Sequence, residues 1–212
     1  MQKYLIRTGF SSKKESLIKS LYRLKKDQII YEAGKGWYST IKGEFKLNTK
    51  PVEKITHLIR KKFPLLEFSC WSTEQIKNYF HHLPSQFITF VYTDKDFLQS
   101  LKDFLTESGY IVYLNPRKRE VEKYVELDKK AVILRPSISY RRRTNQYRAE
   151  MEKILVDLCM ETQNINLIDM EEYKKIVSNV VLNSRINIAV MLDYAHNRKI
   201  KGRIQTIVMK II

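Results

Sequence analysis

A strand–helix–strand pattern in the middle of the chain is the feature that most limits its fold. Residues 87–92 form a short apolar run, and residues 110–114 form a second one. Between them, residues 94–108 carry apolar side chains at helical spacing and end at Gly109, a residue favoured just after a helix. Two strands joined by a helix form a parallel pair through a right-handed crossover, so we expect an α/β sheet here.

The segments on either side differ in kind and divide the chain into three predicted regions. Residues 1–50 are expected to form a winged-helix-like DNA-binding module, and residues 51–140 an α/β domain. Residues 141–212 are expected to form a helical region that packs on that domain. The predicted fold class is therefore α/β, in the sense of mixed α+β, with a C-terminal helical bundle.

Further elements are predicted from the same patterns. They are helices over 52–62, over 72–80 with Ser72 or Thr73 as the cap, and from about residue 146 to the end, and strands over 65–70 and 131–135.

The N-terminal module is predicted from an amphipathic helix followed by a hairpin. In residues 12–26 the side chains of Leu17, Leu21 and Leu24 fall on one stripe, and basic residues cover the rest. Two short strands follow over 28–32 and 37–41, joined by a glycine-bearing turn. A helix followed at once by a two-stranded ribbon is the order found in a winged helix, in which the helix enters the major groove.

Strong positive charge indicates a polyanionic partner. The chain has 39 Lys and Arg against 23 Asp and Glu, a net charge of +16. Residues 1–50 carry 12 basic and 4 acidic side chains, residues 51–112 carry 7 of each, and residues 113–212 carry 20 basic and 12 acidic ones. Two basic zones thus flank a neutral middle, and clustered cations gain affinity for nucleic acid by releasing counterions from phosphates.

Double-stranded DNA is the expected partner of the N-terminal zone. The candidate contacts are the cations of the helix and ribbon with two neighbouring aromatic residues: Lys13, Lys14, Lys19, Tyr22, Arg23, Lys26, Lys35 and Trp37. A second basic surface is predicted at Arg141, Arg142, Arg143 and Arg148, as an auxiliary DNA contact or a protein-binding surface. The alternatives are a solvated helix face for the first set and a disordered basic linker for the second.

The sequence offers no catalytic centre, metal site or cofactor motif. The four histidines lack metal-ligand spacing, and neither a nucleophile elbow nor a phosphate loop is present. Two carboxylate pairs, Asp94 with Asp96 and Glu126 with Asp128, are read more simply as a helix N-terminus and a charged turn. A divergent metal-dependent nuclease built on these pairs, and a basic protein-interaction module without DNA specificity, are the alternative functions.

Cysteine usage and hydropathy favour a cytoplasmic location away from the membrane. Cys70 and Cys159 lie in apolar surroundings and are expected to be buried thiols. We expect neither a signal peptide nor a membrane span, because the first residues lack a long apolar stretch and no later segment is long enough.

Several short motifs together resemble the AbiEi-type antitoxins of type IV toxin–antitoxin systems. Residues 21–30 and 34–38 look like the recognition helix and wing of that family, and Cys70-Trp71-Ser72-Thr73 resembles its strand-to-helix junction. Residues 151–158 and 186–195 are similar to its helical tail. The resemblance implies a winged-helix repressor of its own operon, whose second domain neutralises a nucleotidyltransferase-type toxin. The implied partners are therefore operator DNA and the cognate toxin.

Overall fold

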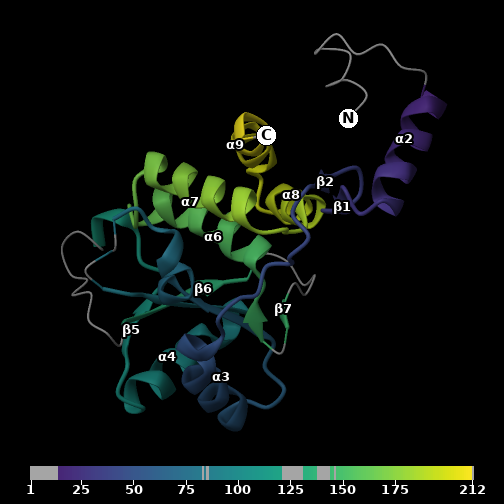
Figure 1. The fold of residues 1–212 in the computed structure, drawn as a ribbon. Coiled ribbons are helices and arrows are strands. Elements are labelled where there is room, and N and C mark those ends of the chain that lie inside the picture. Colours follow the sequence, from purple (N-terminus) through teal and green to yellow (C-terminus); the bar gives the residue numbers. More distant parts are fainter. Residues whose placement is uncertain are drawn as a thin grey trace.

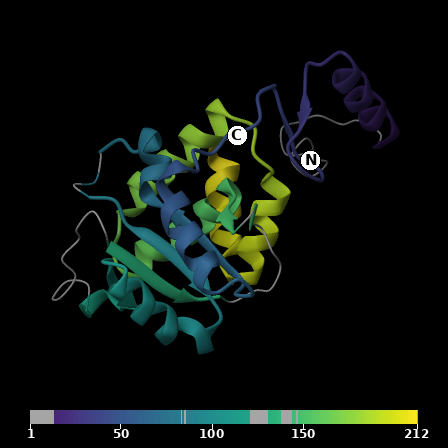
Figure 2. The same cartoon turned by 90° about the horizontal axis from the view of Figure 1, so that it is seen from below.

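A central sheet lies between two layers of helices, and a smaller arm projects from this body (Figures 1 and 2). The computed structural model describes residues 14–82, 84, 86–120, 131–137, 144–145 and 147–211. The predicted mixed α/β class and the C-terminal helices are confirmed. Lys13, Arg141, Arg142, Arg143, Glu126 and Asp128 lie outside the described residues.

The sheet has six strands in the order β5-β6-β4-β3-β8-β7. In chain order they are β3 (Phe68–Ser72), β4 (Thr89–Thr93), β5 (Ile111–Leu114), β6 (Ala131–Pro136), β7 (Thr144–Asn145) and β8 (Arg148–Ala149). β4 and β5 both pair in parallel with β6, whereas β3 runs antiparallel to β4 and parallel to β8.

The expectation that β4 and β5 are neighbours is wrong, because β6 lies between them. Burial explains the order. The apolar run of β6 is buried on both faces from Ala131 to Leu134, as a central parallel strand requires. Ile111 and Leu114 of β5 are 38% exposed, which suits an edge position.

Alternating side chains of the strands form two separate cores. Trp71, Phe90 and Ile133 face the C-terminal helices and belong to one buried cluster. Val91 and Val132 point the other way, into a cluster with the helices α3 (Lys50–Lys62) and α4 (Leu98–Glu107). The period-two alternation of a strand therefore holds both helix layers on the sheet.

Local capping signals define several helix ends. Ser72 caps the helix η1 (Thr73–Tyr79), its hydroxyl accepting from Glu74 while Gln75 accepts from the Ser72 backbone. Asp94 caps the short helix η2 (Lys95–Phe97) that leads into α4. Gly109 follows α4 with a φ of +83°, the left-handed conformation of a helix stop. Two sequence predictions need correction: η1 is a 3₁₀-helix, and strand β3 begins at Phe68 rather than at residue 65.

The C-terminal part is helical, as predicted, and comprises α6 (Met151–Asn164), α7 (Met170–Asn183), α8 (Ile188–Asn197) and α9 (Lys201–Ile211). This layer covers the other face of the sheet, and α9 packs on α7 and α8, away from the strands (Figure 1). Before these helices, β7 and β8 form a small antiparallel pair at the sheet edge, where the sequence predicted no strand and placed the start of a helix at about residue 146. The backbone N–H of Cys70 donates to the carbonyl of Tyr147 (2.9 Å), and the Tyr147 ring stacks on Phe68 at 4.8 Å.

The N-terminal arm consists of α2 (Lys14–Lys26), β1 (Tyr31–Glu32) and β2 (Tyr38–Ser39). The two strands pair antiparallel, with Tyr31 opposite Ser39. Figures 1 and 2 both show α2 at the outer end of the arm, well separated from the sheet. The helix and the hairpin are both present, but each strand has two residues where the sequence predicted five. Their position leaves α2 accessible.

Candidate nucleic-acid interface

The basic face of α2 is open to solvent. Lys19, Arg23 and Lys26 are exposed, and none of them makes an ion pair within the described part of the chain. They recur at spacings of four and three, so they share one side of the helix. Lys14 is the first residue of α2, but its side chain is outside what the structure describes.

The leucine stripe of α2 lies opposite these cations. Leu17, Leu21 and Leu24 are half-buried, as their spacing predicts. Tyr22 lies between the two faces and is 71% exposed, so its ring is available to a partner. Lys25 differs from the free cations because its ammonium pairs with Glu32 of β1 and joins the helix to the ribbon.

The turn of the ribbon is docked on α8 and does not stand free. The Ala33 backbone N–H donates to the Trp37 carbonyl (3.0 Å), and the Ala33 carbonyl accepts from the backbone N–H of Ile188 (2.8 Å). Gly34 has a φ of +103°, and a Cβ there would lie 2.3 Å from Oδ1 of Asn187. Only glycine allows both this conformation and this close approach.

The two remaining ribbon candidates have different surroundings. Lys35, at the tip of the turn, is exposed. Trp37 is half-buried and packs against the main core cluster. The structure thus leaves one cation of the ribbon accessible, while the indole helps to seat the ribbon on the body.

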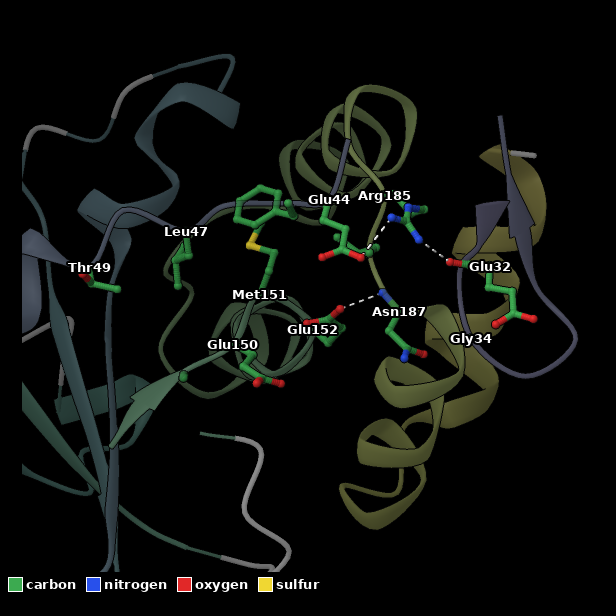
Figure 3. Close-up of a pocket in the computed structure, with 13 residues that line it drawn as sticks. Glu32, Gly34, Glu44, Leu47, Thr49, Glu150, Met151, Glu152, Arg185 and Asn187 are labelled. Carbon is green, nitrogen blue, oxygen red and sulfur yellow. Dashed lines mark hydrogen bonds and ion pairs between the residues drawn. The ribbon is translucent and has the colours of Figure 1, made fainter. Parts of the chain in front are cut away.

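Arg185, in the loop between α7 and α8, ties the arm to the body (Figure 3). Its guanidinium donates to the backbone carbonyl of Glu32 (2.9 Å) and to the carboxylate of Glu44 (2.9 Å). Its own backbone N–H donates to the carbonyl of Gly43 (3.0 Å), and its carbonyl accepts from the N–H of Phe45 (3.1 Å). These bonds fix the base of the arm, and therefore the direction of α2.

An acidic cleft of about 650 Å³ lies at the same junction. Figure 3 shows Glu44, Glu150 and Glu152 around it, with Arg185 on its rim. The backbone N–H of Asn187 donates to the Glu152 carboxylate (2.7 Å). This concentration of carboxylates repels phosphate, whereas the exposed cations of α2 attract it.

The auxiliary basic surface is described only in part. Arg148 forms strand β8 and lies opposite Cys70 of β3 in the sheet register. Nearby, the guanidinium of Arg60 lies over the Tyr147 ring, 5.1 Å from its centroid. The region beside the arginine triplet is therefore anchored to the sheet edge.

Sequence reasoning missed a buried charged network between the sheet, α6 and α8. Lys153, Asp157 and Glu161 recur every four residues along α6, and all are buried. The Lys153 ammonium donates to Asp157 and to the Tyr194 hydroxyl (2.8 Å), and that hydroxyl donates to Asp157 Oδ1 (2.8 Å). Burial lowers the pKa of Lys153, against the opposing effect of Asp157.

Strand residues complete this network. Arg135 of β6 and the Tyr92 hydroxyl of β4 both donate to Glu161, and Arg198 lies 3.3 Å from Asp157. All of these side chains are shielded from solvent, so the network fixes α6 and α8 on the sheet. The signal in the sequence was a Lys–Asp pair at a spacing of four, followed by Glu161, inside an otherwise apolar helix.

The structure shows the role of the Asp94 carboxylate, one half of the first carboxylate pair. The Asp94 carboxylate accepts from the backbone N–H of Asp96 (3.0 Å) as a helix cap, which is the simpler of the two interpretations of this pair. Among the described residues, His, Cys, Asp and Glu form no group of three that could hold a metal ion. In the same part of the chain, no helix has the length and apolar character needed to cross a bilayer.

Comparison with known proteins places the chain in a family. No curated protein matches the sequence. Residues 16–212, which include most of α2 and the whole body, match the family of unknown function DUF6577, and the chain belongs to that family.

Proposed function

We propose that this protein binds double-stranded DNA through α2 and acts as a transcriptional regulator. The observation that carries the proposal is the set of three exposed cations, Lys19, Arg23 and Lys26, on one side of a helix that stands clear of the body (Figure 1). A purely solvated face needs no such separation from the sheet, whereas a helix that enters a groove does.

The dimensions of α2 fit the major groove. Its 13 residues span about 20 Å at 1.5 Å per residue, and the groove of about 12 Å admits one α-helix. Lys19 and Arg23 are one turn apart and can reach phosphates or guanine edges, while Tyr22 offers an exposed ring beside them. Lys35 adds a cation from the ribbon.

The contacts at the base of the arm support a rigid reader. The ribbon is held against the body by the close approach of Gly34 to Asn187 and by the hydrogen bond from Arg185 to the Glu32 carbonyl. The ion pair between Lys25 and Glu32 then holds α2 against the ribbon. A helix presented this way loses little freedom on binding, which lowers the entropic penalty of association.

We further propose that the regulator is the antitoxin of a toxin–antitoxin pair. This step rests on the resemblance of residues 21–30, 34–38, 70–73, 151–158 and 186–195 to AbiEi-type antitoxins. We assign no catalytic step to the chain. The antitoxin proposal is tested by co-expressing this chain with the product of an adjacent nucleotidyltransferase gene. Rescue of growth supports an antitoxin role, and continued toxicity contradicts it.

The DNA-binding experiment is a salt titration with two matched double variants. The probe is the duplex upstream of the protein's own reading frame, compared with a scrambled duplex of the same length. Lys19→Ala with Arg23→Ala is expected to weaken binding at least about tenfold and to reduce the salt slope by about two. Each lost phosphate contact accounts for about one unit of that slope.

The control removes the same charge from another helix. Lys54 and Lys61 are exposed on α3, on the far side of the sheet, and their double alanine variant should bind as the wild type does. Equal losses from both double variants would mean that net charge alone drives binding. No loss from the α2 variant would exclude α2 as the reader.

A further inference from the structure

A groove of about 650 Å³ runs beside the C-terminal helix α9. Met170 of α7 and Ile207 and Ile211 of α9 supply its apolar lining. The lining residues of α9 extend from Gly202 to Ile211, which corresponds to about 14 Å at 1.5 Å per residue. The groove therefore follows α9 for most of its length, with α7 on its other side.

Gly202 is the first residue of α9 that lines the groove. A Cβ at this position would meet no atom within 4 Å, and its φ is not in the left-handed region. Neither backbone conformation nor packing within the described chain requires glycine here. The missing side chain instead leaves space along α9 that a partner's side chain can fill.

Three cations rim the groove. Arg203 and Lys210 are exposed, and neither makes an ion pair with a described acidic residue. Lys174, on the α7 side, pairs with Glu171, which is itself on the solvent side with 75% exposure. The rim thus has an excess of positive charge around an apolar floor.

Shape and charge together define the occupant. An apolar groove between two helices accepts a third helix through its i, i+3, i+4 and i+7 side chains. Arg203 and Lys210, the two exposed cations on α9, favour a helix whose apolar face is bordered by aspartate or glutamate. A second copy of this chain is disfavoured by the net charge of +16, and the apolar floor offers little to a nucleic acid.

We propose that this groove binds an acidic amphipathic helix of a partner protein. The site is on α9, whereas the proposed DNA contacts are on α2 (Figures 1 and 2). The proposal does not depend on DNA binding, and either one can fail without the other.

Two designed peptides of about 18 residues, long enough to form helix in solution, serve as probes. Both carry leucine at i, i+3, i+4 and i+7; one has glutamate and the other lysine along the edges of that face. Fluorescence anisotropy with the full chain should give at least about tenfold tighter binding of the glutamate peptide. Equal affinity for both peptides, or no binding of either, would overturn the proposal.

Substitutions along α9 locate the binding. Gly202→Phe adds a ring to the groove lining at a position where a Cβ meets no atom within 4 Å, and it should weaken binding of the glutamate peptide at least about tenfold, with unchanged thermal unfolding. Gln205→Phe adds the same ring at an exposed position that does not line the groove, and should leave affinity unchanged. Arg203→Glu with Lys210→Glu should reverse the preference in favour of the lysine peptide.

Competing occupants give distinct results. If the wild type binds laurate but neither peptide, and Gly202→Phe loses the laurate, the groove is a fatty-acid site and the proposed binding of a helix is wrong. A concentration-dependent dimer of the wild type that Gly202→Phe dissolves would show that a second copy occupies the groove, against the proposal. Unchanged binding of the upstream duplex by Gly202→Phe would show that the groove acts separately from α2.

Discussion

Arg135 and Glu161 form a buried, two-pronged ion pair between strand β6 and helix α6. The guanidinium donates through Nε (3.1 Å) and NH2 (2.6 Å) to the two carboxylate oxygens, and both side chains are at most 7% exposed. NH1 of Arg135 also donates to Asn115 (3.0 Å) and to the carbonyl of Pro116 (2.7 Å). One arginine therefore joins the ends of two parallel strands to the helix layer.

Removing one side chain of this ion pair should lower the free energy of unfolding far more than removing both. Arg135→Met leaves a buried carboxylate without its counter-ion and should lower the free energy of unfolding by about 3–5 kcal/mol. Adding Glu161→Met should restore most of that loss, since two apolar side chains of similar size can replace a buried pair. Urea unfolding followed by circular dichroism measures both variants.

The exposed pair between Lys77 and Glu74 is the control. Its atoms are 3.5 Å apart and both side chains are more than 40% exposed, so Lys77→Met should change stability by less than about 1 kcal/mol. If Arg135→Met were equally mild, the guanidinium would not be needed to neutralise Glu161.

Substitutions of two glycines in the same turn should distinguish the cost of steric contact from the cost of backbone strain. Gly34 and Gly36 both have positive φ, at +103° and +81°, but only Gly34 faces other atoms, because a Cβ there would come within 3 Å of Asn187 and Ala189. Gly36→Ala should therefore cost about 1–2 kcal/mol from conformation alone. Gly34→Ala should cost more and should also release the turn from α8.

Protection of the Ile188 amide against hydrogen exchange reports that release, because its N–H donates to the carbonyl of Ala33. Gly36→Ala should leave the protection of this amide unchanged. Equal effects of the two substitutions would show that the turn is not held by its contact with α8.

Local structure was predictable from the sequence where a few neighbouring residues decide it. Ser72 was one of the two expected helix caps, Gly109 the expected helix stop, and Leu17 with Leu21 part of the expected helix face. Each of these signals involves residues within four positions of one another, so no knowledge of the rest of the fold is needed.

Strand order and the buried network were not predictable in this way. Nothing in residues 87–114 indicates that Ala131–Pro136 will be inserted between β4 and β5, because that pairing is decided by which strand can be buried on both faces. The partners Arg135 and Glu161 are 26 residues apart. Their contact exists only after the sheet and α6 have come together.

The candidate interface was predictable for α2 and less so for the ribbon. Exposure of Lys19 and Arg23 follows from helix periodicity, and the structure has both on the surface. Docking of Gly34 on Asn187 depends on α8, more than 150 positions later in the chain, and a turn of Gly and Lys gives no hint of it.

Arg185 should control the position of the arm without supporting the body. Arg185→Ala removes donors to Glu32 and Glu44, so the amide of Phe45, which donates to residue 185, should exchange at least about tenfold faster. The amide of Gly109, bonded to Thr106 at the end of α4, should exchange as in the wild type. Hydrogen exchange with mass spectrometry measures both, and faster exchange at both sites would indicate general destabilisation instead.

The Cys70 thiol should make the fold sensitive to alkali. Cys70 is fully buried, and this burial raises its pKa from 9.0 to about 12. Between these two values the unfolded chain releases the thiol proton while the folded chain retains it. The free energy of unfolding should therefore fall as the pH rises through this interval, by up to about 1.4 kcal/mol per pH unit for this group.

Replacing Cys70 by valine isolates the contribution of the thiol. Burial also raises the pKa of the Cys159 thiol above 9.0, so this second thiol adds an equal loss in the wild type and in Cys70→Val. The pKa values of Tyr92 and Tyr173 are raised too, and those phenols add to the loss only above their ordinary value of 10.0. Urea unfolding just above pH 9 should therefore show a falling stability in the wild type and a flatter profile in Cys70→Val. Because valine keeps a similar apolar volume, the two proteins should agree near pH 7 to within about 1.5 kcal/mol. Parallel profiles from neutral to alkaline pH would mean that the thiol ionises as readily in the folded chain as in the unfolded one.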